Sequence, residues 1–150
     1  MFRLLMAALA AGVIFTASAA QAANYNRMTA GELAAVFRAG GYSVGAVNAQ
    51  GIMEVGQSFV WITDCNSEGR CSEINFFNNF RDVHPTLQAV NEWNNTKKLP
   101  EASVNTDGTL HMEIWLSAIG MTDANLIDSF SWFERYSAVL DFWKPYMTGV

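Results

Sequence analysis

Two cysteines with five residues between them stand between two segments of strand-like composition, and this feature constrains the fold more than any other. Residues 59–63, shortly before Cys65, are all aromatic or β-branched, and residues 74–77 after Cys71 are mostly so. Such segments favour β-strands, and the Asn-Ser-Glu-Gly-Arg stretch between the cysteines favours a turn. The sequence therefore predicts a β-hairpin with one cysteine at each side of its loop.

The first residues have the pattern of an exported precursor. Arg3 supplies a positive charge, and residues 4–17 are apolar or small, without an acid or a base. Ala20-Gln21-Ala22 then matches the Ala-x-Ala signature that signal peptidase reads. We expect a signal peptide over residues 1–22 and a mature domain over residues 23–150, periplasmic or secreted. A membrane anchor is the alternative, which the short apolar run and the lack of basic residues after it disfavour.

For an exported chain, a disulfide between Cys65 and Cys71 is the simplest interpretation of the cysteine pair. In chain-entropy terms so short a loop contributes about 2 kcal/mol of stability, so the main effect of the bridge is on register. Redox-active or metal-binding cysteines are the alternative. Their spacing is neither Cys-x-x-Cys nor that of a zinc knuckle, and the chain has no second pair.

If Cys65 and Cys71 lie opposite each other, the register of the two strands is fixed, and so is the set of side chains on each side of the hairpin. The side with the bridge would carry three more opposed pairs: Thr63 with Glu73, Trp61 with Asn75, and Phe59 with Phe77. The other side would carry only apolar residues and should face the core: Val60, Ile62, Ile74 and Phe76.

Trp115 lies on a later segment, residues 109–117, that alternates between apolar and polar residues. Its alternation suggests that Trp115 also points outward. We expect Phe59, Trp61, Phe77 and Trp115 to form an aromatic patch that binds a partner or a second copy of the chain. Another element could cover the patch instead. The alternation of residues shows on which side of a strand a side chain lies, but not what packs against that side.

The rest of the chain predicts three helices and further strands. Helices are expected to begin at Thr29, Thr86 and Thr122, where each threonine can cap the first turn. The first should end at Gly40-Gly41. The second should bury Leu87, Val90 and Trp93, and the third should bury a stripe that includes Leu126, Phe130, Phe133, Leu140 and Trp143.

We expect Pro145 to end the third helix. Additional strands are expected over residues 42–48, 52–57, 99–105 and 109–117, with turns at Gly51 and Asp107-Gly108. This order of elements predicts an α+β fold, with an antiparallel β-sheet on which N-terminal, middle and C-terminal helices pack.

The mature chain is acidic, which restricts its partners. Without Arg3 it has eight basic and fourteen acidic residues, a formal net charge of −6. Nucleic acids and anionic membranes attract clusters of Lys and Arg, so neither is an expected partner. After signal cleavage we expect no stable membrane insertion.

The sequence gives no reason to assign an enzymatic activity. His84 and His111 stand alone, without carboxylates at metal-ligand spacing, and no phosphate-binding loop or dinucleotide fingerprint occurs. We therefore expect no catalytic residues, no metal and no cofactor.

The mature chain resembles the YbjN-domain family, a bacterial family described as sensory transduction regulators. The likeness covers about residues 28–145 and rests on four segments: Met28–Leu33 with Gly40-Gly41-Tyr42, Gly69-Arg70-Cys71, Ile74-Asn75-Phe76, and Val90-Asn91-Glu92-Trp93-Asn94. The resemblance implies a fold similar to type III secretion chaperones and no established enzyme activity. Export is a departure, because members of the family are often cytoplasmic.

Three functions follow as hypotheses. The first is a non-enzymatic, chaperone-like or regulatory module of the cell envelope that binds a peptide or protein partner. The second is a small-molecule or stress-sensing domain with a ligand pocket between helix and sheet. The third is an enzyme of unrecognised type, which a cleft gathering His111 and Glu113 would favour.

Overall fold

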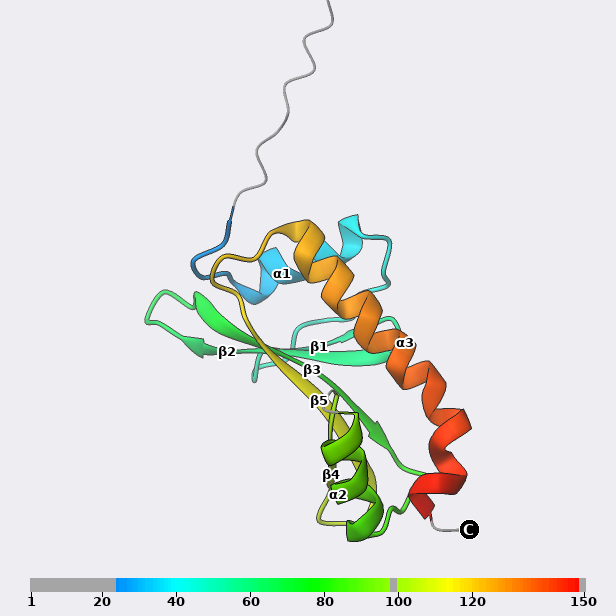
Figure 1. The fold of residues 1–150 in the computed structure, drawn as a ribbon. Helices are drawn as coiled ribbons and strands as arrows, with labels where there is room; N and C mark the ends of the chain where they lie inside the picture. Colours follow the sequence, from blue (N-terminus) through cyan, green and yellow to red (C-terminus); the bar gives the residue numbers. More distant parts are fainter. Residues whose placement is uncertain (1–23, 98–99, 149–150) are drawn as a thin grey trace, which may run out of the picture.

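A five-stranded antiparallel sheet and three helices make up the fold, which confirms the predicted α+β class (Figure 1). The computed structural model describes residues 24–97 and 100–148, with side chains in the last helix described up to Tyr136 and at Met147. The elements are α1 (Ala30–Ala39), β1 (Ile52–Val55), β2 (Ser58–Cys65), β3 (Cys71–Phe80), α2 (Leu87–Thr96), β4 (Glu101–Val104), β5 (Leu110–Ser117) and α3 (Asp123–Thr148). The strand order is β1-β2-β3-β5-β4. The predicted signal peptide lies outside the described residues.

Each helix begins at the predicted threonine. Thr29 and Glu32 form a capping box, in which the Glu32 N–H donates to Thr29 Oγ1 over 3.1 Å and the Thr29 N–H donates to Glu32 Oε2 over 2.7 Å. Thr86 Oγ1 accepts from the Ala89 N–H over 3.1 Å. Thr122 Oγ1 accepts from the Asn125 N–H over 3.2 Å. These bonds satisfy backbone donors that the first helical turn cannot pair internally, and so they fix where each helix starts.

The β2–β3 hairpin has the predicted register. Cys65 lies opposite Cys71, Trp61 opposite Asn75, and Phe59 opposite Phe77. The two Sγ atoms are 1.99 Å apart, at disulfide distance. The pairing therefore separates the side chains of the hairpin into the two sets that the sequence predicts.

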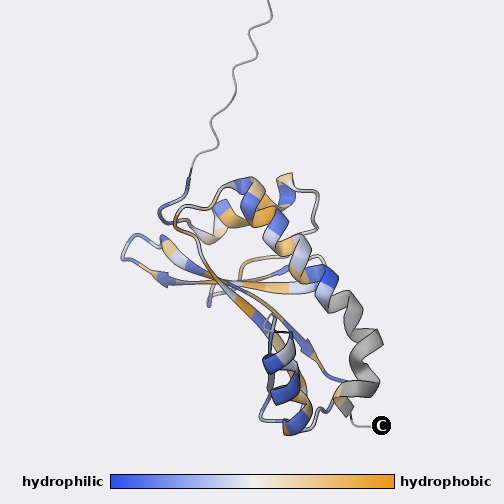
Figure 2. Cartoon of the chain, viewed as in Figure 1, coloured by the Kyte–Doolittle hydropathy of each residue, from blue (hydrophilic) through white to orange (hydrophobic). Residues whose placement is uncertain are grey.

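The helices lie on one face of the sheet, called the inner face here. Its hairpin residues Val60, Ile62, Ile74 and Phe76 are at most 2% exposed. α1 and α3 cover this part of the sheet through Leu33, Phe37, Leu126, Phe130 and Phe133, all fully buried. Alternating hydrophilic and hydrophobic residues along the strands are visible in Figure 2.

α2 covers the inner face at the other end of the sheet, beside β4 (Figure 1). Its residues Ala89, Val90 and Trp93 pack with Ala102, Leu110 and Met112 in a second buried cluster. Met147 near the end of α3 belongs to the same cluster, so α3 contributes to both ends of the core. One face of a single sheet thus carries the whole described core.

Leu87 is 72% exposed, so the prediction that α2 buries it is wrong. The helix turns by about 100° per residue, which places Leu87 about 120° around the axis from Trp93. Ala89, Val90 and Trp93 lie closer together on the circumference and form the buried stripe. The spacing of three residues that joins Leu87 to Val90 and Trp93 therefore does not coincide with the buried stripe of α2.

α3 continues past Pro145 to Thr148, so the prediction that this proline ends the helix is also wrong. Proline removes one backbone donor, and other contacts can still hold the turn. Here the Thr86 N–H donates to the Met147 carbonyl over 3.2 Å, and Met147 is fully buried. The predicted contributions of Leu140 and Trp143 to the apolar stripe lie outside the described side chains.

Both outer strands of the sheet have part of their free edge occupied. Residues 42–48, predicted as a strand, instead run irregularly along β1: the Gly45 N–H donates to the Glu54 carbonyl and the Asn48 N–H to the Ile52 carbonyl, both over 2.9 Å. Only Val44 and Val55 form a β-bridge. The glycine and alanine content of this segment gives it little strand propensity.

On β4 the edge is occupied by a side chain. Asn94 of α2 accepts from the Ala102 N–H through Oδ1 over 2.8 Å and donates from Nδ2 to the Ala102 carbonyl over 2.9 Å. Its amide thus makes the two bonds that another strand would make at this residue. Next to it, Trp93 Nε1–H donates to the Pro100 carbonyl over 2.8 Å.

Candidate functional site

The outer face of the sheet gathers the four aromatic residues predicted there. The register places Phe77 of β3 between Phe59 of β2 and Glu113 of β5. It also places Asn75 between Trp61 and Trp115. The four aromatic side chains therefore share one side of three adjacent strands. We call this set the aromatic face: Phe59, Trp61, Phe77 and Trp115.

The rings form two contacting pairs that leave part of their surface accessible. Phe59 and Phe77 are stacked with centroids 5.4 Å apart, and Trp61 and Trp115 meet edge to face at 5.7 Å. Phe59 is 37% exposed and Trp115 is 45% exposed, while Trp61 and Phe77 are half-buried. None of the four belongs to either buried cluster of the described residues. The alternative in which a described element covers the patch is therefore not the one observed.

Asn75 lies beneath the tryptophans and was not recognised from the sequence as part of the site. It is on the outer side, yet it is only 2% exposed, since it is flanked by Trp61 and Trp115. Its Nδ2 donates to Glu113 Oε2 over 2.7 Å, so the buried amide has a charged acceptor. The bond holds the Glu113 carboxylate beside the aromatic face.

A polar strip continues the aromatic face toward β4. His111 Nδ1 is 2.8 Å from Asn79 Oδ1, and His111 Nε2 is 3.5 Å from Glu113 Oε2. The imidazole also lies 5.7 Å from the Phe77 ring, centroid to centroid. His111 and Glu113 do meet, as an enzyme hypothesis would require, but they lie on a sheet face and line neither of the two pockets described below.

The acidic side chains of the strands are not matched by basic ones. None of the five strands contains Lys or Arg. Four glutamates occupy outer positions of the register: Glu54, Glu73, Glu101 and Glu113. The face is therefore an aromatic surface bordered by carboxylates.

A pocket of about 530 Å³ opens at the end of the aromatic face, beyond Trp115. Ile119, 57% exposed, provides an apolar wall opposite the indole, and Glu73 provides a carboxylate. Its lining residues are Ser72, Glu73, Trp115, Leu116, Ser117 and Ile119. A second pocket of about 330 Å³ lies between residues 24–27 and the hairpin loop. Neither pocket is lined by a helix residue, so neither supports a ligand site between helix and sheet.

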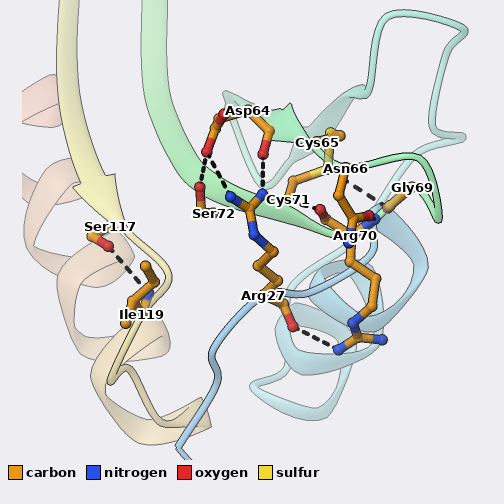
Figure 3. A network of polar contacts seen from close by, with 10 residues as sticks. All are labelled: Arg27, Asp64, Cys65, Asn66, Gly69, Arg70, Cys71, Ser72, Ser117 and Ile119. Carbon is orange, nitrogen blue, oxygen red and sulfur yellow. Dashed lines mark hydrogen bonds and ion pairs between the residues drawn. A yellow bond between two sulfur atoms is a disulfide. The ribbon is translucent and has the colours of Figure 1, made fainter.

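A polar network ties the start of the described chain to the hairpin (Figure 3). Arg27 Nη1 donates to the Asp64 carbonyl over 2.5 Å, and Nη2 donates to Asp64 Oδ2 over 3.2 Å. The Ser72 hydroxyl donates to the same carboxylate, and this bond, with Arg27, lowers the pKa of Asp64. Met28 and Cys71 exchange two backbone hydrogen bonds nearby. The hairpin is thus fixed at its loop end by the chain that precedes α1.

Neither a nucleophile elbow nor a metal-binding cluster is formed in the described part of the chain. Gly41-Tyr42-Ser43-Val44-Gly45 has the Gly-x-Ser-x-Gly spacing, but it follows a helix instead of joining a strand to a helix, the context that a nucleophile elbow needs. No group of three His, Cys, Asp or Glu residues within residues 24–97 and 100–148 could hold a metal ion. No helix in those ranges combines the length and apolarity needed to span a bilayer.

Fold and site together define a one-sheet α+β domain whose helices cover one face and whose other face displays aromatic residues among carboxylates. Compared with known proteins, the chain matches no family model, no curated protein and no solved structure.

Proposed function

We propose that this protein is a non-enzymatic binding module that holds a peptide or protein partner on the aromatic face. The observation that carries the proposal is the partial exposure of Phe59 and Trp115 on a face without a described helix. Soluble domains seldom leave contiguous large aromatic side chains accessible without a binding role. Aromatic residues are also the commonest centres of binding energy in protein interfaces.

The arrangement of the rings supports this proposal. Stacked and edge-to-face contacts hold the aromatic side chains in place before a partner arrives. Side chains ordered in advance lose less rotamer freedom on binding, so more of the contact energy remains as affinity. The bond from Asn75 to Glu113 orders the polar border of the face in the same way.

The setting that we propose is the cell envelope, because the predicted signal peptide and the cysteine pair both suit an oxidising compartment. The YbjN-like segments support a regulatory or chaperone-like role of the same kind.

Site-specific photo-crosslinking in the producing cells tests the proposal. The photoreactive substitution Phe59→benzoylphenylalanine keeps a phenyl ring at the aromatic face. Leu87→benzoylphenylalanine is the matched control, because Leu87 is an even more exposed apolar residue and lies on α2, on the opposite side of the sheet. We expect a discrete adduct from position 59 and none of the same mass from position 87.

A second substitution links the adduct to the face. Trp115→Ala removes the most exposed ring of the aromatic face and should abolish the adduct at position 59, while circular dichroism stays unchanged. Equal adducts from both positions, or an adduct indifferent to Trp115→Ala, would show that the aromatic face is not the binding surface.

A further inference from the structure

The closed edges of the sheet restrict how a partner can bind. Extended peptides often add to a sheet by pairing with an edge strand. Here Asn94 occupies both edge-facing backbone groups of Ala102 on β4, and residues 43–48 accompany β1. Among the described strands, the outer face therefore offers more continuous accessible surface than the backbone of either edge.

The charge of that face selects the partner. Glu54, Glu73, Glu101 and Glu113 occupy outer positions, and no strand supplies a Lys or Arg to balance them. A second copy of the chain, packed face to face, would bring like charges together. An acidic partner would do the same, whereas a cationic partner would find opposite charges and be steered toward the face.

The pocket beyond Trp115 has the chemistry of a receptor for one long cationic side chain. Trp115 and Ile119 offer apolar walls along which the methylene stem of Lys or Arg can lie. The indole face attracts a cation, and the Glu73 carboxylate can pair with it. The Glu73 side chain is exposed and makes no hydrogen bond or ion pair with another described residue, so its charge is available.

We propose that the aromatic face binds an extended, lysine- or arginine-rich segment of a partner protein, with one cationic side chain in the pocket formed by Trp115, Ile119 and Glu73. This inference rests on the proposed function and adds the chemical class of the partner. The remaining cationic side chains lie over the face, near Glu113 and Glu54. Apolar parts of the segment contact the stacked rings of Phe59 and Phe77.

The test uses three acetylated and amidated octapeptides, in which serine alternates with lysine, with glutamate or with leucine. Each is titrated into the ¹⁵N-labelled mature protein, and the indole N–H resonances are followed. We expect the lysine peptide to move the resonances of Trp115 and Trp61. Trp93 is an internal reference that should stay in place, because its indole is buried and bonded to the Pro100 carbonyl.

Variants locate the cationic subsite. Glu73→Gln should weaken binding of the lysine peptide by roughly threefold, the scale of a solvent-exposed ion pair. Trp115→Ala should weaken it by about tenfold, since it removes the main wall of the pocket. Glu92→Gln is the matched control, because it makes the same charge change on the exposed side of α2 and should leave affinity unchanged.

Two results would overturn the cationic assignment. One is a response of Trp115 to the leucine or glutamate peptide that equals or exceeds the response to the lysine peptide. The other is an affinity for the lysine peptide that Glu73→Gln and Glu92→Gln lower equally. Crosslinking at position 59 would still decide the proposed function independently, because that experiment makes no assumption about charge.

Discussion

Both faces of the sheet carry aromatic residues, but the two faces differ in what lies against those residues. Phe76 and Phe77 are neighbours on β3. The Phe76 ring contacts Phe37, Phe130 and Phe133 from the helices and is fully buried, whereas the Phe77 ring contacts Phe59 and His111 on other strands. Aromatic residues on the inner face thus hold the fold together, and those on the outer face remain accessible to a partner.

The largest expected effect tests this comparison directly. Phe76→Ala should lower the free energy of unfolding by about 3–5 kcal/mol, because it leaves a cavity beneath α1 and α3. Phe77→Ala should cost less than half as much, because its ring is already partly in contact with water. Urea denaturation of both variants measures the difference, and equal losses would contradict the assignment of core and surface.

The next effect concerns the attachment of α2 to the inner face. Asn94→Ala should lower the free energy of unfolding by about 2–3 kcal/mol, because the N–H and the carbonyl of Ala102 both lose their partner. The neighbouring substitution Asn95→Ala lies at an exposed position and should change stability by less than about 0.5 kcal/mol. Thermal unfolding of the pair would measure this, and similar melting temperatures would rule out the role of the Asn94 amide.

Removal of the disulfide tests how the two faces are kept distinct, because the bridge fixes the strand register, and the register decides on which face each side chain lies. Replacing both cysteines, Cys65→Ser with Cys71→Ser, should cost about 2 kcal/mol by the chain-entropy estimate for a short loop. The Trp61 and Trp115 indole resonances should shift little, since the strands retain their ladder. A mass measurement of the unmodified protein with and without reductant would show whether the bridge forms, and free thiols would contradict it.

The smallest effect is a pH dependence at the end of the inner face. The Tyr25 hydroxyl donates to Asp123 Oδ1 over 2.5 Å, and this bond, with partial burial, raises the pKa of Tyr25 to about 12. Since the folded pKa lies above the ordinary value of 10, the contribution is complete below pH 10 and is lost as pH rises toward 12. Urea midpoints at pH 9 and pH 11.5 should therefore fall further for the wild type than for Tyr25→Phe. Parallel falls would contradict this.

The hairpin and its faces could be predicted from the sequence because the information is local. The cysteine spacing sets the register of Phe59, Trp61 and Phe77, and a period of two then determines their side of the sheet. Exposure could not be predicted in the same way. It depends on which face the helices cover, and that is a property of the assembled chain.

Two contributors to the site and its surroundings were missed for a similar reason. Asn75 was placed on the correct side, but its burial depends on Trp115, forty residues later in the chain. Asn94 lies in the predicted second helix, yet its bonds to Ala102 depend on the position of α2 relative to β4. Polar side chains that bind distant backbone leave no periodic signal in a sequence.

The amide of Asn94 also limits what the protein can assemble into. A strand added to an edge presents a new edge, so that mode of association can repeat without end and lead to fibres. A sheet face that is already covered by a partner leaves no equivalent surface to which another molecule could bind. Pairing Ala102 of β4 with a side chain therefore disfavours endless strand addition at this edge, even though the domain keeps aromatic surface in contact with water.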